Sequence, residues 1–64
     1  MKVNGAFVVL EERQSLFDFL TMQKFDLTTI AVERNGKIIP KAAYKEVLLE
    51  NEDNLEIVRF VGGG

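Results

Sequence analysis

Two Asn-Gly pairs, Asn4-Gly5 and Asn35-Gly36, interrupt apolar segments of this 64-residue chain. β-favouring residues flank each pair, and Asn-Gly is the strongest short-range signal for a two-residue type I′ hairpin turn. At the first pair we expect a short strand that ends at Val3 to turn into the strand AFVVL, residues 6–10.

The second Asn-Gly pair should join the strand IAVER, residues 30–34, to the strand KII, residues 37–39. Pro40 follows directly and should end that strand, because proline has no N–H to donate to a ladder. The pattern therefore predicts two separate hairpins, one near each end of an intervening segment.

That intervening segment, QSLFDFLTMQK at residues 14–24, has the spacing of an amphipathic helix. Ser15 followed three residues later by Asp18 resembles a capping box, with Asp in place of the usual Glu or Gln. The buried stripe should consist of Leu16, Phe19 and Leu20. Aromatic side chains dominate small cores, so we expect three flanking residues in the core or at its edge: Phe17, Met22 and Phe25.

The remaining segments complete a recognisable order of elements. KAAYKEVLL, residues 41–49, can form a short helix, and ENEDN, residues 50–54, is a polar turn before the final strand LEIVRFV, residues 55–61. Since a helix connects two hairpins, the economical arrangement is one mixed sheet with the helix covering one face. The sequence therefore predicts an α+β fold with the ubiquitin-like β-grasp layout: about five strands, one main helix packed on one face and a short second helix.

The final strand should divide its side chains between the two faces of the sheet. Alternation places Leu55 and Ile57 on the face that packs on the helix, and Glu56, Val58 and Phe60 on the other. Exposed apolar residues on an uncovered face often mark a partner site. The alternative is that the short helix or a loop covers them.

Composition narrows the possible functions. Hydrophobic residues make up 47% of the chain and charged residues 28%, which is typical of a folded globular domain. The chain has no cysteine and no histidine, so it lacks disulfides, thiolate ligands and the commonest general base. A chain of this length also has little room for an enclosed pocket. We therefore expect a protein on which partner enzymes act rather than an enzyme.

Charge and hydropathy argue against nucleic-acid and membrane partners. The net charge is −2 and the eight basic residues are scattered along the chain, which does not favour binding to a phosphate backbone. The apolar runs are far shorter than the roughly 20 residues that span a bilayer, and no signal-peptide pattern begins the chain. The expectation is a cytoplasmic protein that is monomeric when free.

An acidic stretch lies around the turn before the final strand and could be interpreted as a metal site. Its members are Glu50, Glu52, Asp53 and Glu56. It lacks the spacing and the glycine of an EF-hand loop, so we interpret it as a solvated turn and expect no bound metal. The same charges can steer the protein toward a basic groove on a partner.

Three consecutive glycines, Gly62, Gly63 and Gly64, follow the predicted final strand. Without side chains to pack, they should form a flexible tail, residues 62–64, beyond a β-grasp domain at residues 1–61. Such a tail reaches about 10 Å and can thread a narrow channel. Its carboxylate needs activation before it can react with a nucleophile, and the chain has no nucleotide-binding loop of its own. The other interpretation is that the glycines are inert linker residues.

Two segments, AVERNGKIIPKAAY at residues 31–44 and DNLEIVRFVGGG at residues 53–64, resemble the ThiS family of sulfur carriers in thiamine biosynthesis, within the ubiquitin-like β-grasp superfamily. The resemblance implies that an E1-like adenylyltransferase, using ATP and Mg²⁺, adenylates the last glycine. A cysteine desulfurase or another source then supplies sulfur for a thiocarboxylate, and thiazole synthase takes up that sulfur. The resemblance also implies that the carrier itself binds no cofactor.

Carried over to this sequence, the resemblance makes Gly64 the residue that bears first the adenylate and then the thiocarboxylate. Gly63 is the other half of the terminal pair, and Gly62 adds reach. The residues expected to contact partner enzymes are Glu56, Val58, Phe60 and Val61.

One departure from the family concerns the turn before the last strand. The family usually has Gly-Asp there, whereas Glu52 precedes Asp53 in this chain. We therefore expect Asn51 or Asn54 to occupy any position of that turn that needs a positive φ.

Several other functions are known for proteins with a glycine tail, and the sequence is compatible with each of them. They are a small subunit of molybdopterin synthase, a carrier for cysteine synthesis or tRNA thiolation, and a modifier that forms isopeptide bonds with lysines. A different class is a β-grasp interaction module whose glycines are inert. The length and the NGKIIP hairpin, residues 35–40, favour the thiamine branch.

Overall fold

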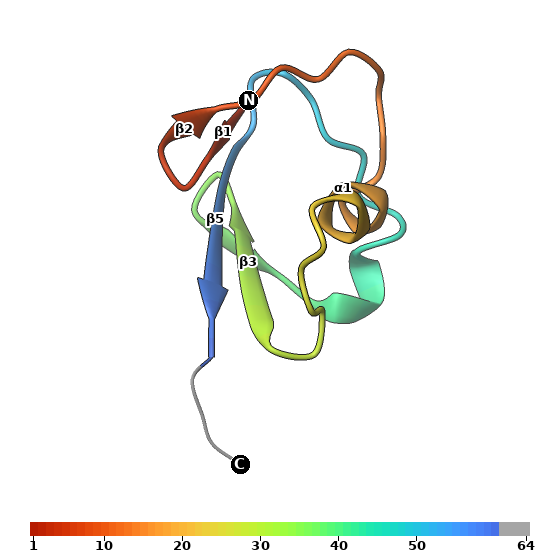
Figure 1. Cartoon of the computed structure of the whole chain (residues 1–64), viewed down its shortest axis with the longest axis vertical. Coiled ribbons are helices and arrows are strands. Elements are labelled where there is room, and N and C mark those ends of the chain that lie inside the picture. Colours follow the sequence, from red (N-terminus) through yellow and green to blue (C-terminus); the bar gives the residue numbers. More distant parts are fainter. Residues whose placement is uncertain (61–64) are drawn as a thin grey trace.

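A five-stranded mixed sheet forms one layer of the molecule in this computed structural model, which describes residues 1–60 (Figure 1). Its spatial order is β2-β1-β5-β3-β4. Strands β1 and β5 are parallel, and the other neighbours are antiparallel. The strands are β1 (Lys2–Val3), β2 (Ala6–Phe7), β3 (Ile30–Arg34), β4 (Lys37–Ile39) and β5 (Asn54–Arg59).

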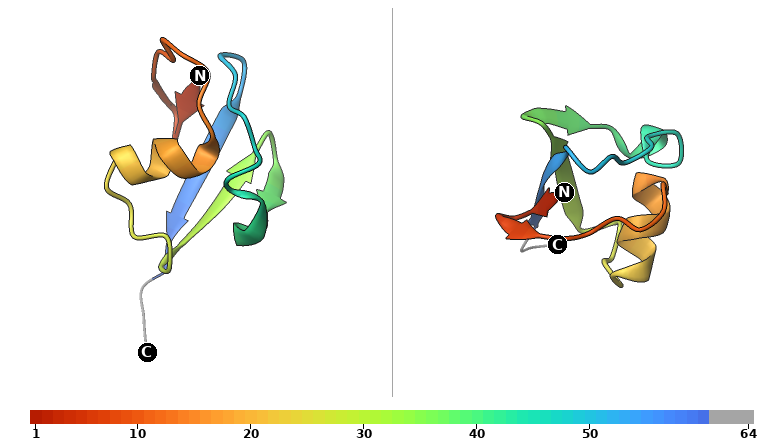
Figure 2. Two further views of the ribbon diagram at one scale, coloured as in Figure 1. Left: turned by 90° about the vertical axis from the view of Figure 1, so that its right-hand side faces the viewer. Right: turned by 90° about the horizontal axis from the view of Figure 1, so that it is seen from above.

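The helix α1 (Leu16–Met22) packs on one face of the sheet (Figure 2). Its N-terminus is capped as the sequence predicts, since the Ser15 hydroxyl oxygen accepts a hydrogen bond of 3.0 Å from the backbone N–H of Asp18. Two further N–H groups of the first turn donate to the segment after β4, Leu16 to the Val47 carbonyl and Phe17 to the Tyr44 carbonyl. Because these donors have no partner inside the helix, the bonds fix the helix against the rest of the chain.

The core lies between the sheet and this helix. The predicted stripe is confirmed, because Leu16, Phe19 and Leu20 are all buried. The sheet contributes Ile30, Val32, Leu55 and Ile57, and the connecting segments add Met1, Leu10, Tyr44 and Leu49. Phe17 and Phe25 are partly buried against this cluster, as expected. The expectation for Met22 was wrong: the residue is 72% exposed, because a position six residues after Leu16 lies about 120° around the helix from it.

Both predicted hairpins are confirmed. Asn4 and Gly5 have φ values of 52° and 85°, and Asn35 and Gly36 have 52° and 86°, which are the left-handed conformations that type I′ turns require. The strands β3 and β4 have the predicted bounds. The strand β2 is shorter than expected and ends at Phe7, because β1 offers only two residues for pairing.

The segment between β4 and β5 differs in detail from the expectation. The short helix is the three-residue 3-10 helix η1 (Lys41–Ala43), which lies on the same side of the sheet as α1 (Figure 2). The turn before β5 needs no positive φ, so neither Asn51 nor Asn54 adopts one: in the described part of the chain the non-glycine residues with positive φ are Asn4, Lys24 and Asn35.

Asp53 is a further correction, because it is buried rather than part of a solvated turn. Its carboxylate accepts hydrogen bonds from Arg34 Nε at 2.9 Å, Asn35 Nδ2 at 3.1 Å and the backbone N–H of Glu50 at 2.9 Å. Burial opposes ionisation of this carboxyl, but these hydrogen bonds and the Arg34 charge outweigh it, so the pKa of Asp53 is lowered. The interactions tie the β3–β4 turn to the residue just before β5.

Candidate functional site

The central strand β5 buries two of its six residues, and the other four are exposed. Leu55 and Ile57 are buried against α1, whereas Val58 is 52% exposed and Phe60, just after the strand, is 58% exposed. The predicted division of the strand between two faces is therefore confirmed. The structure also decides between the two interpretations of Val58 and Phe60, since neither the 3-10 helix nor a loop within residues 1–60 covers them.

The strand register adds two more apolar residues to the same face, which we call the open face. Phe7 in β2 lies across from Lys2, and Ile38 in β4 lies across from Glu33. Their side chains are 82% and 73% exposed. Both helical segments lie on the opposite side of the sheet, so residues 1–60 leave the open face accessible (Figure 2).

Charges of both signs occur on the open face. Glu33 of β3 pairs directly across from Glu56 of β5, on the side opposite to the buried pair Val32 and Ile57. At the β1 side, the Lys2 ammonium lies 5.2 Å from the centre of the Phe7 ring, which is cation–π distance. The middle of the open face is thus acidic, and exposed apolar residues together with Lys2 lie toward its edges.

The backbone at the end of β5 is fixed by its neighbours. Arg59 pairs with Ile30 of β3, and the N–H of Phe60 donates a hydrogen bond of 2.7 Å to the Thr29 carbonyl. The chain is therefore held in place up to residue 60. Val61 and the three glycines, residues 62–64, lie outside the described residues, as does the proposed boundary between domain and tail.

Within residues 1–60 the open face carries no acid–base pair. The three groups of the described region with a shifted pKa are all explained by local structure. A hydrogen bond from the Thr28 hydroxyl lowers the pKa of Asp26, burial raises the pKa of Tyr44, and the Asp53 carboxylate is held by the β3–β4 turn. None of these groups belongs to the open face.

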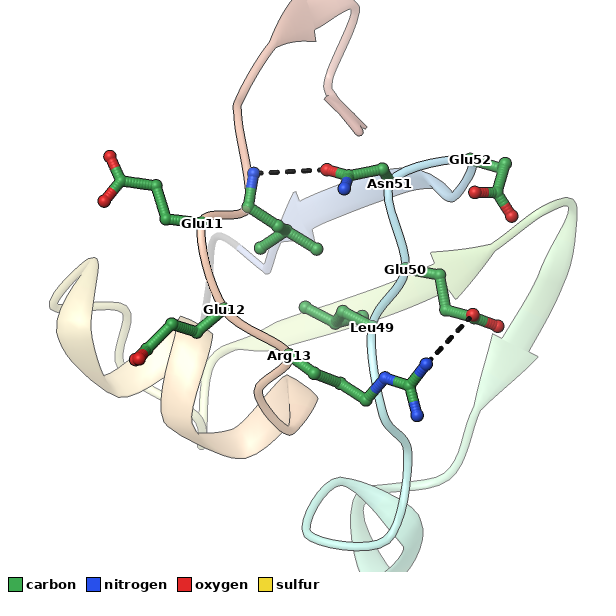
Figure 3. Close-up of a pocket in the computed structure, with 8 residues that line it drawn as sticks. Glu11, Glu12, Arg13, Leu49, Glu50, Asn51 and Glu52 are labelled. Carbon is green, nitrogen blue, oxygen red and sulfur yellow. Dashed lines mark hydrogen bonds and ion pairs between the residues drawn. The ribbon is translucent and has the colours of Figure 1, made fainter.

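A shallow pocket lies between the segment after β2 and the segment before β5 (Figure 3). It contains four glutamates, but their carboxylates point in different directions, and Arg13 Nη2 approaches Glu50 Oε1 at 3.9 Å. Asn51 Oδ1 accepts a hydrogen bond of 3.2 Å from the Leu10 N–H and so joins the two segments. Within residues 1–60 no three acidic groups converge to hold a metal ion.

Some members of the open face were not predicted from the sequence. Phe7, Glu33 and Ile38 reach it through strand pairing, and the pairing register depends on contacts between distant segments. The alternation of residues 30–34 predicts that Glu33 points away from the core, but not that it pairs with Glu56.

Among residues 1–60 no helix has the length and apolar character needed to cross a bilayer.

Comparison with known proteins gives concordant results. The model of the ThiS family matches residues 1–64. The sulfur carrier protein ThiS of Bacillus subtilis is 47% identical over 65 residues, which cover 100% of this chain and 98% of that protein. A thiazole synthase of Paramagnetospirillum magneticum is 51% identical over 39 residues, covering 61% of this chain and only 12% of that enzyme.

Solved structures agree with the sequence comparison. The crystal structure of the thiamine biosynthesis protein ThiS from Geobacter metallireducens superimposes with a TM-score of 0.84 at 26% identity. The match covers 98% of this chain and 96% of that one. The predicted β-grasp architecture, a mixed five-stranded sheet with one main helix, is thereby confirmed.

Proposed function

Since the chain belongs to the ThiS family, the sulfur carrier proteins of thiamine biosynthesis, we propose that it carries sulfur as a thiocarboxylate on Gly64. The observation that carries this proposal is the full-length similarity to the sulfur carrier of Bacillus subtilis together with a family match that includes residues 62–64. The fixed end of β5 supports it, because the anchored Phe60 lies just before those residues.

The chemistry begins at the carboxylate of Gly64, which is a poor electrophile. An E1-like adenylyltransferase supplies ATP and Mg²⁺, and a carboxylate oxygen attacks the α-phosphorus of ATP and displaces pyrophosphate. The terminal sulfur of a persulfide made by a cysteine desulfurase, or sulfide from another donor, then displaces AMP from the acyl carbon. Sulfide gives the thiocarboxylate directly, whereas a persulfide gives an acyl disulfide that a thiol reductant must cleave to release the thiocarboxylate. One oxygen of the carboxylate is thereby replaced by sulfur. The reacting groups other than Gly64 belong to the partner enzymes, so the chain is a co-substrate rather than an enzyme.

The open face provides the surface on which the activating enzyme docks. Val58 and Phe60 are exposed apolar residues at the end of the sheet from which the glycines continue. Glu56 lies beside them on β5, and Val61 follows Phe60. Apolar anchors of this kind supply much of the binding energy at protein interfaces. Docking there holds the glycines in the partner's active site.

Thiazole synthase is the proposed acceptor of the sulfur. The similarity of residues in this chain to part of a thiazole synthase supports a link between the two proteins. In this scheme the thiocarboxylate sulfur attacks an electrophilic carbon of the thiazole precursor on that enzyme. A cytoplasmic location is part of the proposal, because it places the carrier beside ATP and a reduced sulfur donor.

The intact mass of the protein tests the proposal most directly. Protein purified from its own host shows whether Gly64 is the mature carboxyl terminus. Incubation with the cognate activating enzyme, ATP, Mg²⁺ and a sulfur donor should then add about 16 Da, the difference between sulfur and oxygen. A thiol alkylator should trap the product, and a reaction without ATP is the control.

Different results support different functions. Transfer of sulfur to molybdopterin, to a cysteine precursor or to tRNA, but not to the thiazole precursor, assigns the chain to another pathway. An adduct on lysine side chains of other proteins indicates a modifier. If the folded protein ends at Gly64 and the cognate enzyme produces neither an adenylate nor a thiocarboxylate, the chain is an interaction module with an inert tail.

A further inference from the structure

Two glutamates occupy directly opposite positions in the middle of the open face. Glu33 and Glu56 are direct partners across β3 and β5. Such partners have Cβ atoms roughly 4.5–5.5 Å apart, and like charges at these positions destabilise a sheet. The pair therefore works against folding of the free protein.

The described cations near this pair have other partners. The Arg34 side chain is on the helix side of the sheet, where its Nε donates to Asp53 and its Nη2 to the Leu48 carbonyl. The Lys2 ammonium lies over the Phe7 ring. Within residues 1–60 the ion pairs are Arg13 with Glu50 and Arg34 with Asp53, so neither Glu33 nor Glu56 has a cation within salt-bridge distance.

Exposed apolar side chains border the two glutamates on the β4 side and toward the end of β5. Ile38 lies across from Glu33 on β4, and Val58 is the next residue of β5 that points to the same side as Glu56. Both are more than half exposed. An acidic pair framed by apolar residues is complementary to a cation that is itself surrounded by apolar groups.

We propose that Glu33 and Glu56 together bind one arginine side chain of the activating enzyme, while Ile38 and Val58 pack against apolar residues around that arginine. A guanidinium suits this position because its planar array of donors can bond to two carboxylates, and because it is more weakly hydrated than an ammonium. The inference rests on the proposed function, and it assigns a specificity role to Glu33.

The activating enzyme is the partner that most needs such a contact. It meets the carrier while Gly64 still ends in an ordinary carboxylate, which any protein ending in glycine presents. The activating enzyme must therefore distinguish the carrier from other proteins through contacts with its folded domain. Thiazole synthase, in contrast, can recognise the thiocarboxylate itself. The unfavourable charge pair in the free protein becomes a favourable one in the complex, which is the pattern expected of a recognition element.

Steady-state adenylation by the cognate enzyme tests the inference with the variants Glu33→Gln, Glu56→Gln and the double variant. We expect the double variant to raise the KM for the carrier at least about tenfold, with kcat within about twofold, because the lost contact acts in docking. The same variant should melt about 2–5 °C higher, since repulsion within the pair is removed. The KM of the wild type should rise with salt, and that of the double variant should change less.

The control is the double variant Glu12→Gln/Glu46→Gln. It changes the net charge equally at exposed positions outside the strands, and its KM should stay within about twofold of the wild type, as rim charges contribute little affinity. Equal effects of the two double variants would reduce the role of Glu33 and Glu56 to general steering and overturn the inference.

Other outcomes separate this inference from the proposed function. If the wild type is adenylated normally and the Glu33→Gln/Glu56→Gln variant keeps its KM, the inference is wrong and the proposed function stands. A rise in KM accompanied by a lower melting temperature would show a structural role and also overturn it. A defect confined to sulfur transfer on thiazole synthase would assign the pair to that enzyme instead. If the wild type is not adenylated at all, both proposals fail together.

Discussion

Asn4 and Ile57 lie 53 residues apart in the chain and exchange two hydrogen bonds. The side-chain oxygen of Asn4 accepts from the Ile57 N–H at 2.7 Å, and its side-chain nitrogen donates to the Ile57 carbonyl at 3.2 Å. The side-chain amide of Asn4 thus makes the two hydrogen bonds to β5 that the backbone of a further strand residue would make. It thereby extends the parallel pairing of β1 with β5. A turn residue that already has a left-handed φ therefore also fixes the strand that carries Val58.

Replacing Asn4 by glycine should lower the free energy of unfolding by about 1–2 kcal/mol. Glycine keeps the positive φ of this turn, so the change isolates the two side-chain hydrogen bonds, each of which contributes about 0.5–1.5 kcal/mol. Urea denaturation at neutral pH measures the difference. The control is Lys24→Gly, because Lys24 also has a positive φ but its side chain makes no hydrogen bond to any residue between 1 and 60. Equal changes in the two variants would show that the Asn4–Ile57 contact contributes nothing.

Asp53 should make the stability of the protein depend on pH in the acid range. Its pKa is lower in the folded state than the ordinary value of 3.8. A carboxyl of this kind stabilises the fold above its unfolded pKa, and that contribution disappears as the pH falls through the lower, folded pKa. The Asp53→Asn variant should therefore be less stable at neutral pH by about 1–3 kcal/mol, since an amide nitrogen would face donors that now bond to the carboxylate.

Denaturation curves from neutral pH down to below 3.8 measure this effect. The difference between wild type and Asp53→Asn should be greatest at neutral pH and shrink at the acid end. Asp26→Asn is the matched control, because the pKa of Asp26 is also lowered, first by the bond from the Thr28 hydroxyl, but the residue lies at the surface. We expect Asp26→Asn to lose less stability than Asp53→Asn. If the difference in unfolding free energy between wild type and Asp53→Asn does not change with pH, ionisation of Asp53 does not cause the pH dependence.

Local signals in the sequence predicted most of the fold. Asn-Gly pairs specify their turns because few residues tolerate a positive φ, and Ser15 specifies the start of α1 because its hydroxyl caps a free N–H. These effects act over four residues or fewer. The helix spacing likewise identifies Leu16, Phe19 and Leu20 as core residues without knowledge of their partners.

The parts that the sequence did not predict depend on distant partners. Asp53 belongs to a polar segment, and only the approach of the β3–β4 turn, with Arg34 and Asn35, makes its burial favourable. The pairing of Glu33 with Glu56 follows from strand register, which is fixed by the whole sheet. Val58 and Phe60 could be assigned to the open face because alternation along one strand is a local property.

The Val58→Asp/Phe60→Asp variant tests whether the open face binds the activating enzyme. We expect the KM for adenylation to rise at least about tenfold, because two apolar contacts are replaced by charges that must be desolvated. The control is Val9→Asp/Met22→Asp. Those side chains are also largely exposed, at 80% and 72%, but they border a groove beside α1 rather than the open face. Circular dichroism should first show that both variants are folded. An unchanged KM for the Val58/Phe60 variant excludes this docking surface.

Deletion of Gly63 and Gly64 separates the carrier function from the function of the folded domain. The core and the hydrogen bonds described here involve residues 1–60, so the free energy of unfolding should change by less than about 0.5 kcal/mol. Thiocarboxylate formation should be abolished, because the chain then ends at Gly62 and the carboxylate does not reach the activating site. The truncated protein should still compete with the intact carrier for the activating enzyme, since Val58 and Phe60 remain.

If the truncated protein is inactive and also fails to compete, the glycines themselves supply the binding energy. If sulfur transfer continues without them, Gly64 does not carry the sulfur.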